Sequence, residues 1–173
     1  SVKHLNKLEK INLPYWKSAP CISEDIISLG QYRWDPIPIT KKGDTFITGM
    51  RTITTTGDVG MQTGMASHVY VADKSMDKDY FYSADSELLV VPQLGGLVFK
   101  SELGLIDFAP GEVALIPRGL VFSVLLRDEI CRGFVCENYG QKFILPNRGP
   151  IGANCLANSR DFKVPHAYFE DKE

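Results

Sequence analysis

The sequence predicts an all-β domain that folds as a sandwich or a barrel. Eight short runs rich in β-branched and aromatic residues lie between residues 46 and 138. Turn signals separate these runs at short, regular intervals, which is typical of such folds. No part of this region has the 3.6-residue periodicity of an amphipathic helix. The pattern therefore favours many short strands over a helical or mixed fold.

The runs and the turns between them define the expected elements. Gly95-Gly96 and Pro110-Gly111 are two of the turn signals, and the first predicts a tight hairpin. The segments 88–91 and 121–126 are apolar on both faces, whereas a sheet with one face in water alternates. We therefore expect a second sheet on one side and a neighbouring subunit or a further domain on the other. The expected strands are 46–56, 67–72, 87–92, 97–100, 105–108, 113–116, 121–126 and 131–138.

The two ends of the chain differ in composition from its centre. A length of 173 residues suggests one domain. Residues 1–32 mix charges, prolines and a short aromatic patch, and they predict an extended, irregular N-terminal arm. Residues 33–173 form the domain itself, in which 146–173 is a loop-rich segment of glycine, proline and asparagine. The abrupt charged end at Glu173 suggests a domain boundary or a cut.

Composition excludes several classes of protein. Nineteen basic and 21 acidic residues leave a net charge of −2, and no Lys/Arg cluster points to nucleic acid. No stretch of about 18 apolar residues suggests a membrane span, and no signal peptide is visible. The four cysteines form no CxxC pair, which favours reduced thiols in a cytoplasmic protein. They are Cys21, Cys131, Cys136 and Cys155.

Residues 111–122 form the pattern G-x5-P-x-G-x2-F. It resembles the second signature of the cupin family, small β-barrels that often hold a metal, in which the last position is a histidine in the metal-binding members. Phe122 has no lone pair to offer. If Glu87 takes the glutamate position of the first cupin signature, Tyr80 and Tyr82 take its histidine positions. The resemblance implies a cupin-like jelly-roll sandwich or barrel with an aromatic-lined interior, or alternatively a cavity that binds an aromatic ligand.

The histidines and cysteines give little support for catalysis. His4, His68 and His166 show no HxH, HxxxH or HxE spacing, so they do not predict the two histidines and one carboxylate of a non-haem iron site. His68 lies on an alternating run and is expected to be a hydrogen-bonded strand histidine. Cys131 and Cys136 are five residues apart on one expected strand, so we expect them to face opposite sides.

A second resemblance to a known family rests on segments between residue 33 and the end of the chain. The most specific of these segments is 149–154, followed by 156–158 and 160–162, while residues 1–30 resemble that family poorly. On these motifs the chain resembles the N-terminal domain of the homogentisate 1,2-dioxygenase family. Further matching segments are 33–36, 49–52, 75–76, 81–82, 91–93, 118–119, 139–140, 143–146 and 168–171.

The resemblance implies an enzyme that opens the ring of homogentisate with Fe(II) and O2, giving maleylacetoacetate in the breakdown of tyrosine and phenylalanine. It implies a homo-oligomer, a hexamer built as a dimer of trimers. The family's iron ligands, two histidines and a glutamate, lie in a C-terminal domain beyond the point where this sequence stops. No catalytic or metal-binding residue is therefore assigned here, and the fragment alone is expected to bind no iron and to be inactive.

The late loop holds the only site candidates. Asn154, Asn158, Arg160 and Asp161 are candidates for an interface or a substrate loop. Arg160 and Asp161 could brace the loop, or could reach the active site of a partner subunit. A function of a different class is also open, a free-standing degenerate cupin that binds a small aromatic ligand or a partner protein without catalysis.

Overall fold

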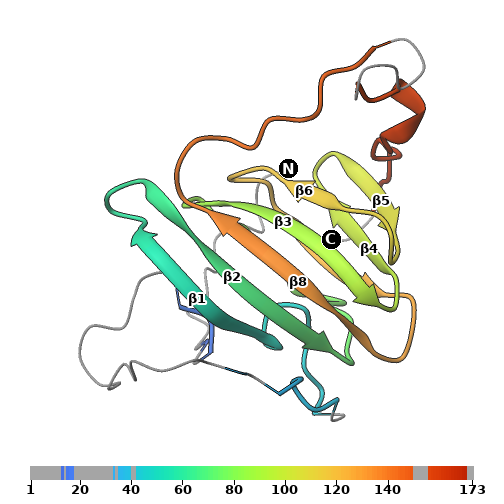
Figure 1. Ribbon diagram of the computed structural model, residues 1–173. Coiled ribbons are helices and arrows are strands. Elements are labelled where there is room, and N and C mark those ends of the chain that lie inside the picture. The colour runs from blue at the N-terminus through green and yellow to red at the C-terminus, as the bar shows by residue number, and fades with distance from the viewer. Residues whose placement is uncertain are drawn as a thin grey trace.

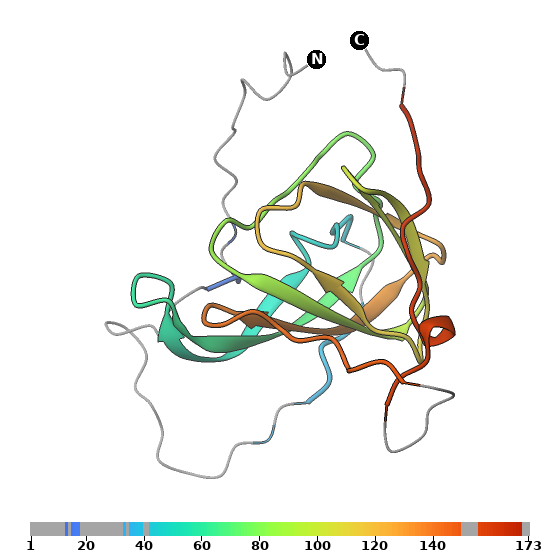
Figure 2. The ribbon, with the colours of Figure 1, turned by 90° about the horizontal axis from the view of Figure 1, so that it is seen from above.

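The computed structural model describes residues 13, 15–17, 33, 35–39, 42–149 and 156–170. They form two antiparallel sheets that face each other (Figures 1 and 2), which confirms the all-β fold class. The five-stranded sheet has the order β1-β2-β8-β3-β6 and the three-stranded sheet the order β5-β4-β7. Along the chain the elements are β1 (Met50–Asp58), β2 (Thr63–Ala72), β3 (Glu87–Leu94), β4 (Leu97–Ser101), β5 (Gly104–Phe108), β6 (Ala114–Ile116), β7 (Phe122–Leu126), β8 (Cys131–Asn138) and the 3-10 turn η2 (Ser159–Asp161).

The strand order is that of a jelly roll. The last strand, β8, lies between β2 and β3 and pairs antiparallel with both. At the edge of the three-stranded sheet, Phe81 forms an isolated antiparallel bridge with Phe122 on β7, where a fourth strand would lie. Closing the sandwich in this way leaves few free edges.

Each expected strand corresponds to an observed one, but the starts of the first two strands are wrong. The second strand begins at Thr63 and not at residue 67, because residues 63–66 pair with the end of β1 in a hairpin. The first strand begins at Met50 and not at residue 46, because residues 46–49 form a turn closed by a 2.8 Å hydrogen bond from Gly49 N to Thr45 O. Phe46 and Ile47 on this turn are buried in the core, so their apolar character reflects packing and not strand formation.

The interior between the sheets is lined with aromatic rings. Phe99 and Phe122 are stacked with their centroids 5.2 Å apart, and Phe46 meets both edge-on. The predicted aromatic interior is therefore correct, but two of its members are wrong. Tyr80 and Tyr82 are 49% and 42% exposed, so neither occupies the inward position that the motif alignment gave it.

The C-terminal segment runs beside the three-stranded sheet, as the red trace in Figure 2 shows. Leu105 and His166 exchange two backbone hydrogen bonds of 2.8 and 2.7 Å. Lys163 Nζ donates to the carbonyl oxygen of Asp107. Lys100, which is only 8% exposed, pairs with Glu170. The chain itself thus covers part of this sheet.

The outer face of the five-stranded sheet is also apolar. We define the outer sheet patch as the apolar residues on this face, Val69, Leu89, Val91, Val113, Leu115 and Phe134. Phe134 lies opposite both Val69 and Val91, and Leu89 lies opposite Leu115, so the patch is continuous across the sheet. Phe134 remains 52% exposed and Val113 57% exposed.

The two cysteines of β8 lie on opposite sides of the sheet, as expected. Cys131 is fully buried in the core, Cys136 is partly exposed on the outer side, and both thiols are free. Burial raises the pKa of both thiols. In the part of the chain that the structure describes, no helix has the length and apolarity to cross a membrane.

Candidate functional site

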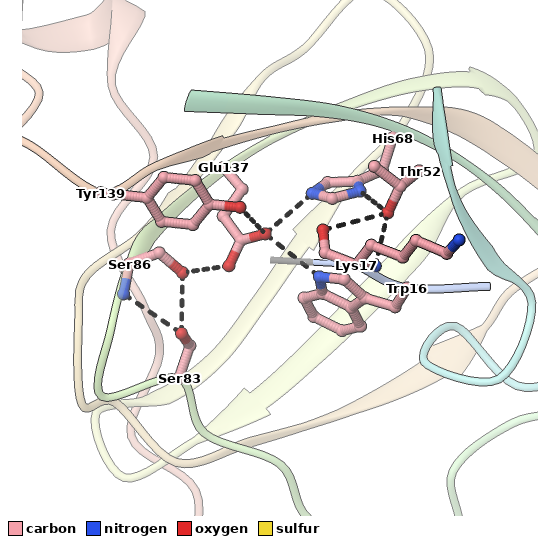
Figure 3. Close-up of polar contacts among 8 residues, drawn as sticks. All are labelled: Trp16, Lys17, Thr52, His68, Ser83, Ser86, Glu137 and Tyr139. Atoms are coloured by element: carbon pink, nitrogen blue, oxygen red, sulfur yellow. Dashed lines mark hydrogen bonds and ion pairs between the residues drawn. The ribbon is translucent and has the colours of Figure 1, made fainter. Parts of the chain in front are cut away.

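A buried carboxylate, that of Glu137, collects four hydrogen bonds inside the barrel (Figure 3). One oxygen, Oε2, lies 2.9 Å from Nε2 of His68, 3.1 Å from Nε1 of Trp16 and 3.3 Å from the hydroxyl of Tyr139. The other oxygen, Oε1, accepts a 2.6 Å bond from Oγ of Ser86. Glu137 is only 3% exposed, so these donors replace the water that a carboxylate requires.

The strand pattern brings the pair at the centre of this cluster together. On β8 the inward positions are 131, 133, 135 and 137, and on β2 they are 66, 68, 70 and 72. His68 lies opposite Val135 in the ladder, which makes Glu137 its diagonal neighbour on the same face. Long side chains at diagonal positions are within reach of each other. The contact therefore follows directly from the register of β2 and β8.

His68 is a hydrogen-bonded strand histidine, as the sequence predicted. Its Nδ1 lies 3.0 Å from Oγ1 of Thr52, its ladder partner on β1. Its Nε2 faces the Glu137 carboxylate, so we assign a hydrogen to Nε2. Both ring nitrogens are engaged in the interior, and the residue has no exposed surface.

Trp16 reaches the cluster from the predicted arm. Its indole packs against the rings of His68 and Phe81, with centroid distances of 5.6 and 5.2 Å. The residues on both sides of it are tied to β1 at Thr52, whose backbone N–H donates to the carbonyl oxygen of Tyr15 at 2.9 Å and whose hydroxyl accepts from the N–H of Lys17 at 2.8 Å. The segment 15–17 therefore lies across β1 and directs one ring into the barrel.

The hydrogen bonds decide the charge of the cluster. Burial alone would raise the pKa of the Glu137 carboxyl, but the bonds it accepts from His68, Ser86 and Trp16 outweigh burial and hold its pKa below the usual range. Burial, together with the neighbouring Glu137 carboxylate, raises the pKa of Tyr139. Glu137 is thus ionised and Tyr139 neutral at pH 7.

The residues present do not fit a non-haem iron centre. Such a centre needs two histidines and a carboxylate with open positions for ligands, whereas this cluster has one histidine and one carboxylate whose lone pairs are already used. Trp16 and Phe81 fill the space beside them. No group of three or more histidine, cysteine, aspartate or glutamate side chains suited to a metal occurs among the described residues.

The candidates of the late loop lie elsewhere. Asn158 caps η2 through its side chain, which accepts from the N–H of Arg160 at 3.1 Å, and Asp161 accepts from the N–H of Asn158 at 2.7 Å. This capping box fixes the turn locally, so Asn158 and Asp161 brace the loop. Arg160 is exposed, and Asn154 lies outside the described residues.

Sequence reasoning did not single out Glu137, Trp16, Ser86 or Tyr139. One signal was available for Glu137, because the alternation along residues 131–138 places it on the same side as Cys131 and Val135, and a charge on the core side of a strand needs partners. No comparable signal existed for Trp16, which meets Glu137 across 121 residues of sequence.

Comparison with known proteins shows the family of this chain. The sequence model of a family described as the homogentisate 1,2-dioxygenase N-terminal domain matches residues 1–173. The chain belongs to this family. A homogentisate 1,2-dioxygenase of Rhizobium leguminosarum bv. trifolii (strain WSM2304) is 55% identical over 175 residues, and that of Rhizobium meliloti (strain 1021) is 50% identical. Each alignment covers 100% of this chain but 39% of the relative, so the chain spans about two fifths of their length.

Solved structures that resemble the chain include cupin-domain proteins. A cupin-2 domain protein of Shewanella frigidimarina NCIMB 400 matches with a TM-score of 0.42 at 17% identity. The match covers 51% of this chain and 78% of that protein's chain. The Cnp3 cupin domain of Schizosaccharomyces pombe has a TM-score of 0.43 at 12% identity, covering 52% of this chain and 64% of its own.

Proposed function

We propose that this chain is the non-catalytic N-terminal domain of a cytoplasmic homogentisate 1,2-dioxygenase. The parent enzyme would use Fe(II) and O2 to convert homogentisate to maleylacetoacetate in the catabolism of tyrosine and phenylalanine. One observation carries the proposal: the N-terminal family model matches the whole chain, while the chain spans 39% of its enzyme relatives. The iron would then be held by residues that this chain does not contain.

The interior of the barrel supports a structural role. The one buried histidine–carboxylate pair in the described residues has its lone pairs and hydrogens committed to Thr52, Ser86, Trp16 and Tyr139. Phe122, at the position of the third cupin histidine, is 1% exposed and stacked on Phe99. These contacts stabilise the fold and leave no open position for a substrate or O2.

The outer sheet patch supports a role in assembly. Burying a large apolar side chain stabilises by about 1.5–3 kcal/mol, so a continuous patch of this kind favours a partner. Residues 163–170 lie against the three-stranded sheet, whereas Phe134 and Val113 of the patch keep about half of their surface exposed. We therefore assign the patch to a neighbouring subunit of a homo-oligomer.

Oxygen uptake tests the division of labour. The purified 173-residue chain, given homogentisate and ferrous iron, should consume no O2 and retain no stoichiometric iron. The parent enzyme under the same conditions should consume O2 and retain iron. Uptake with one iron per chain would refute the non-catalytic role. An inactive parent enzyme, loaded with iron, would refute the assigned reaction.

A pair of matched variants of the parent enzyme tests the assembly surface. Phe134→Asp places a charge in the outer sheet patch, whereas Leu103→Asp places one on the β4–β5 turn, where Leu103 is 62% exposed. Light scattering should show a smaller oligomer for Phe134→Asp and an unchanged oligomer for Leu103→Asp. Equal masses for the two variants would show that the patch is not an interface.

We also keep Arg160 as an interface candidate, because its side chain is exposed while the neighbouring Asn158 and Asp161 are used within the turn. In the parent enzyme, Arg160→Ala should loosen the oligomer more than it alters iron content. An unchanged oligomer with lost iron would contradict this role.

A further inference from the structure

The contacts of Trp16 have the composition of a ligand site. A flat ring contacts two other rings, those of His68 and Phe81, at centroid distances of 5.6 and 5.2 Å and interplanar angles of 58° and 37°. Its single polar atom, Nε1, donates to the Glu137 carboxylate at 3.1 Å. Small-molecule sites use aromatic walls with one convergent polar group to fix the orientation of an aromatic ligand.

We propose that the space next to the rings of Phe81 and His68 and the carboxylate of Glu137 is a binding site for a planar aromatic ring that carries one hydrogen-bond donor. The indole of Trp16 occupies this site in the structure. Phe81 and His68 supply the two walls. Glu137 recognises the donor, and its carboxylate is held in place by Ser86 at 2.6 Å and by His68 at 2.9 Å. The site is therefore preorganised, because its acceptor is oriented whether or not a ring is present.

The acceptor defines the ligand class. An ionised carboxylate accepts hydrogen bonds and donates none, so rings with an N–H or O–H group fit and rings without a donor leave the acceptor unpaired. A hydrogen bond to a charged group corresponds to on the order of ten- to a hundredfold in affinity. Indole should therefore bind much more tightly than benzothiophene, which has the same shape and no donor.

The resident ring competes with any free ligand. Trp16 is anchored to β1 through Tyr15 and Lys17, so its effective concentration at the site is at least on the order of millimolar. In the wild-type chain, free indole should bind at least about tenfold more weakly than in a chain without this ring. The segment 15–17 would act as an internal lid, and a ligand gains access only when the lid leaves.

The test uses Trp16→Gly and the 173-residue chain. Indole should bind this variant saturably in calorimetry and raise its melting temperature, whereas benzothiophene should do neither to a similar extent. The matched control is Tyr15→Gly, which changes the same segment at a ring that is 56% exposed and leaves the site filled. Indole should not stabilise Tyr15→Gly. Equal effects of the two ligands, or of indole on the two variants, would overturn the proposal.

A second variant and a second measurement apply if Trp16→Gly does not fold. Trp16→Phe keeps a ring without a donor, so free indole should bind it more tightly than the wild type, and no gain would overturn the proposal. In a Trp34→Phe background, where Trp16 is the only tryptophan, its indole N–H proton should resonate downfield and shift when Glu137→Gln is added. An unshifted proton would also overturn the proposal. Neither result depends on iron or on homogentisate, so both are distinct from the proposed enzyme activity.

Discussion

Replacing the central carboxylate by an apolar group of similar size tests whether the buried cluster stabilises the domain. In Glu137→Leu the donors of His68 and Tyr139, both fully buried, lose their acceptor and cannot reach water. An unsatisfied buried group costs about 1–3 kcal/mol, so two of them cost about 2–6 kcal/mol. Because 1 kcal/mol shifts the melting midpoint of a chain of this size by about 2–4 °C, the midpoint should fall by roughly 10 °C.

The matched control is Glu87→Leu. Glu87 is almost equally buried, at 5% exposed, but among the described residues its carboxylate accepts one hydrogen bond, at 2.7 Å from the backbone N–H of Phe143. Phe143 lies in a partly exposed segment where water can replace the lost acceptor, so the loss should be about 1 kcal/mol. Urea denaturation of both variants gives the comparison. In other proteins, buried ion pairs have been replaced by apolar residues without loss of stability. If Glu137→Leu and Glu87→Leu lose equal free energies of unfolding, or if Glu137→Leu is more stable than the wild type, the reasoning is refuted.

Two further predictions concern acid stability and the C-terminal segment. The pKa of Glu137 is lower in the folded than in the unfolded chain, so the stability it contributes is full above the ordinary glutamate pKa of about 4.3 and is lost as the pH falls below that value. In urea titrations, the stability difference between wild type and Glu137→Gln should therefore shrink below about pH 4. A difference that does not depend on pH would contradict this. Gly104 has φ +113°, and a Cβ there would lie 2.1 Å from the carbonyl oxygen of His166, whereas Gly111 has φ +96° and open space. Both alanine variants incur about 1–2 kcal/mol of backbone strain, but only Gly104→Ala should also release residues 163–170 to proteolysis, and equal cleavage would show that this contact does not hold the segment.

The strands were predictable because two local signals agree along most of the chain. Period-2 burial and turn residues between the runs fix β2 to β8 to within a few residues, and the observed ladders follow. The first strand was misplaced where one of these signals fails. Phe46 and Ile47 are as apolar as strand residues, but they are buried by a turn. Local periodicity cannot separate an apolar turn packed on a core from an apolar strand.

The site was less predictable because its contacts are long-range. The motif alignment put Tyr80 and Tyr82 inside the barrel, whereas Phe81 faces Trp16 and Phe122, so the alignment was wrong by one residue. In an extended segment a shift of one residue exchanges the inner and outer faces. Parity along β8 identifies Glu137 as a buried charge, but only the folded chain shows that Trp16 is one of its partners.

The two sheets differ in how their outer faces are covered, and this difference connects the fold with the proposed role. On the three-stranded sheet, residues of the same chain supply backbone bonds at Leu105 and an ion pair at Lys100. On the five-stranded sheet, Phe134 is half-exposed in the centre of the patch, flanked by Val69 and Val91. A surface of this kind is unfavourable in water. Since the interior is filled by the chain's own Trp16 cluster, the outer face is the part of this domain best suited to a subunit contact.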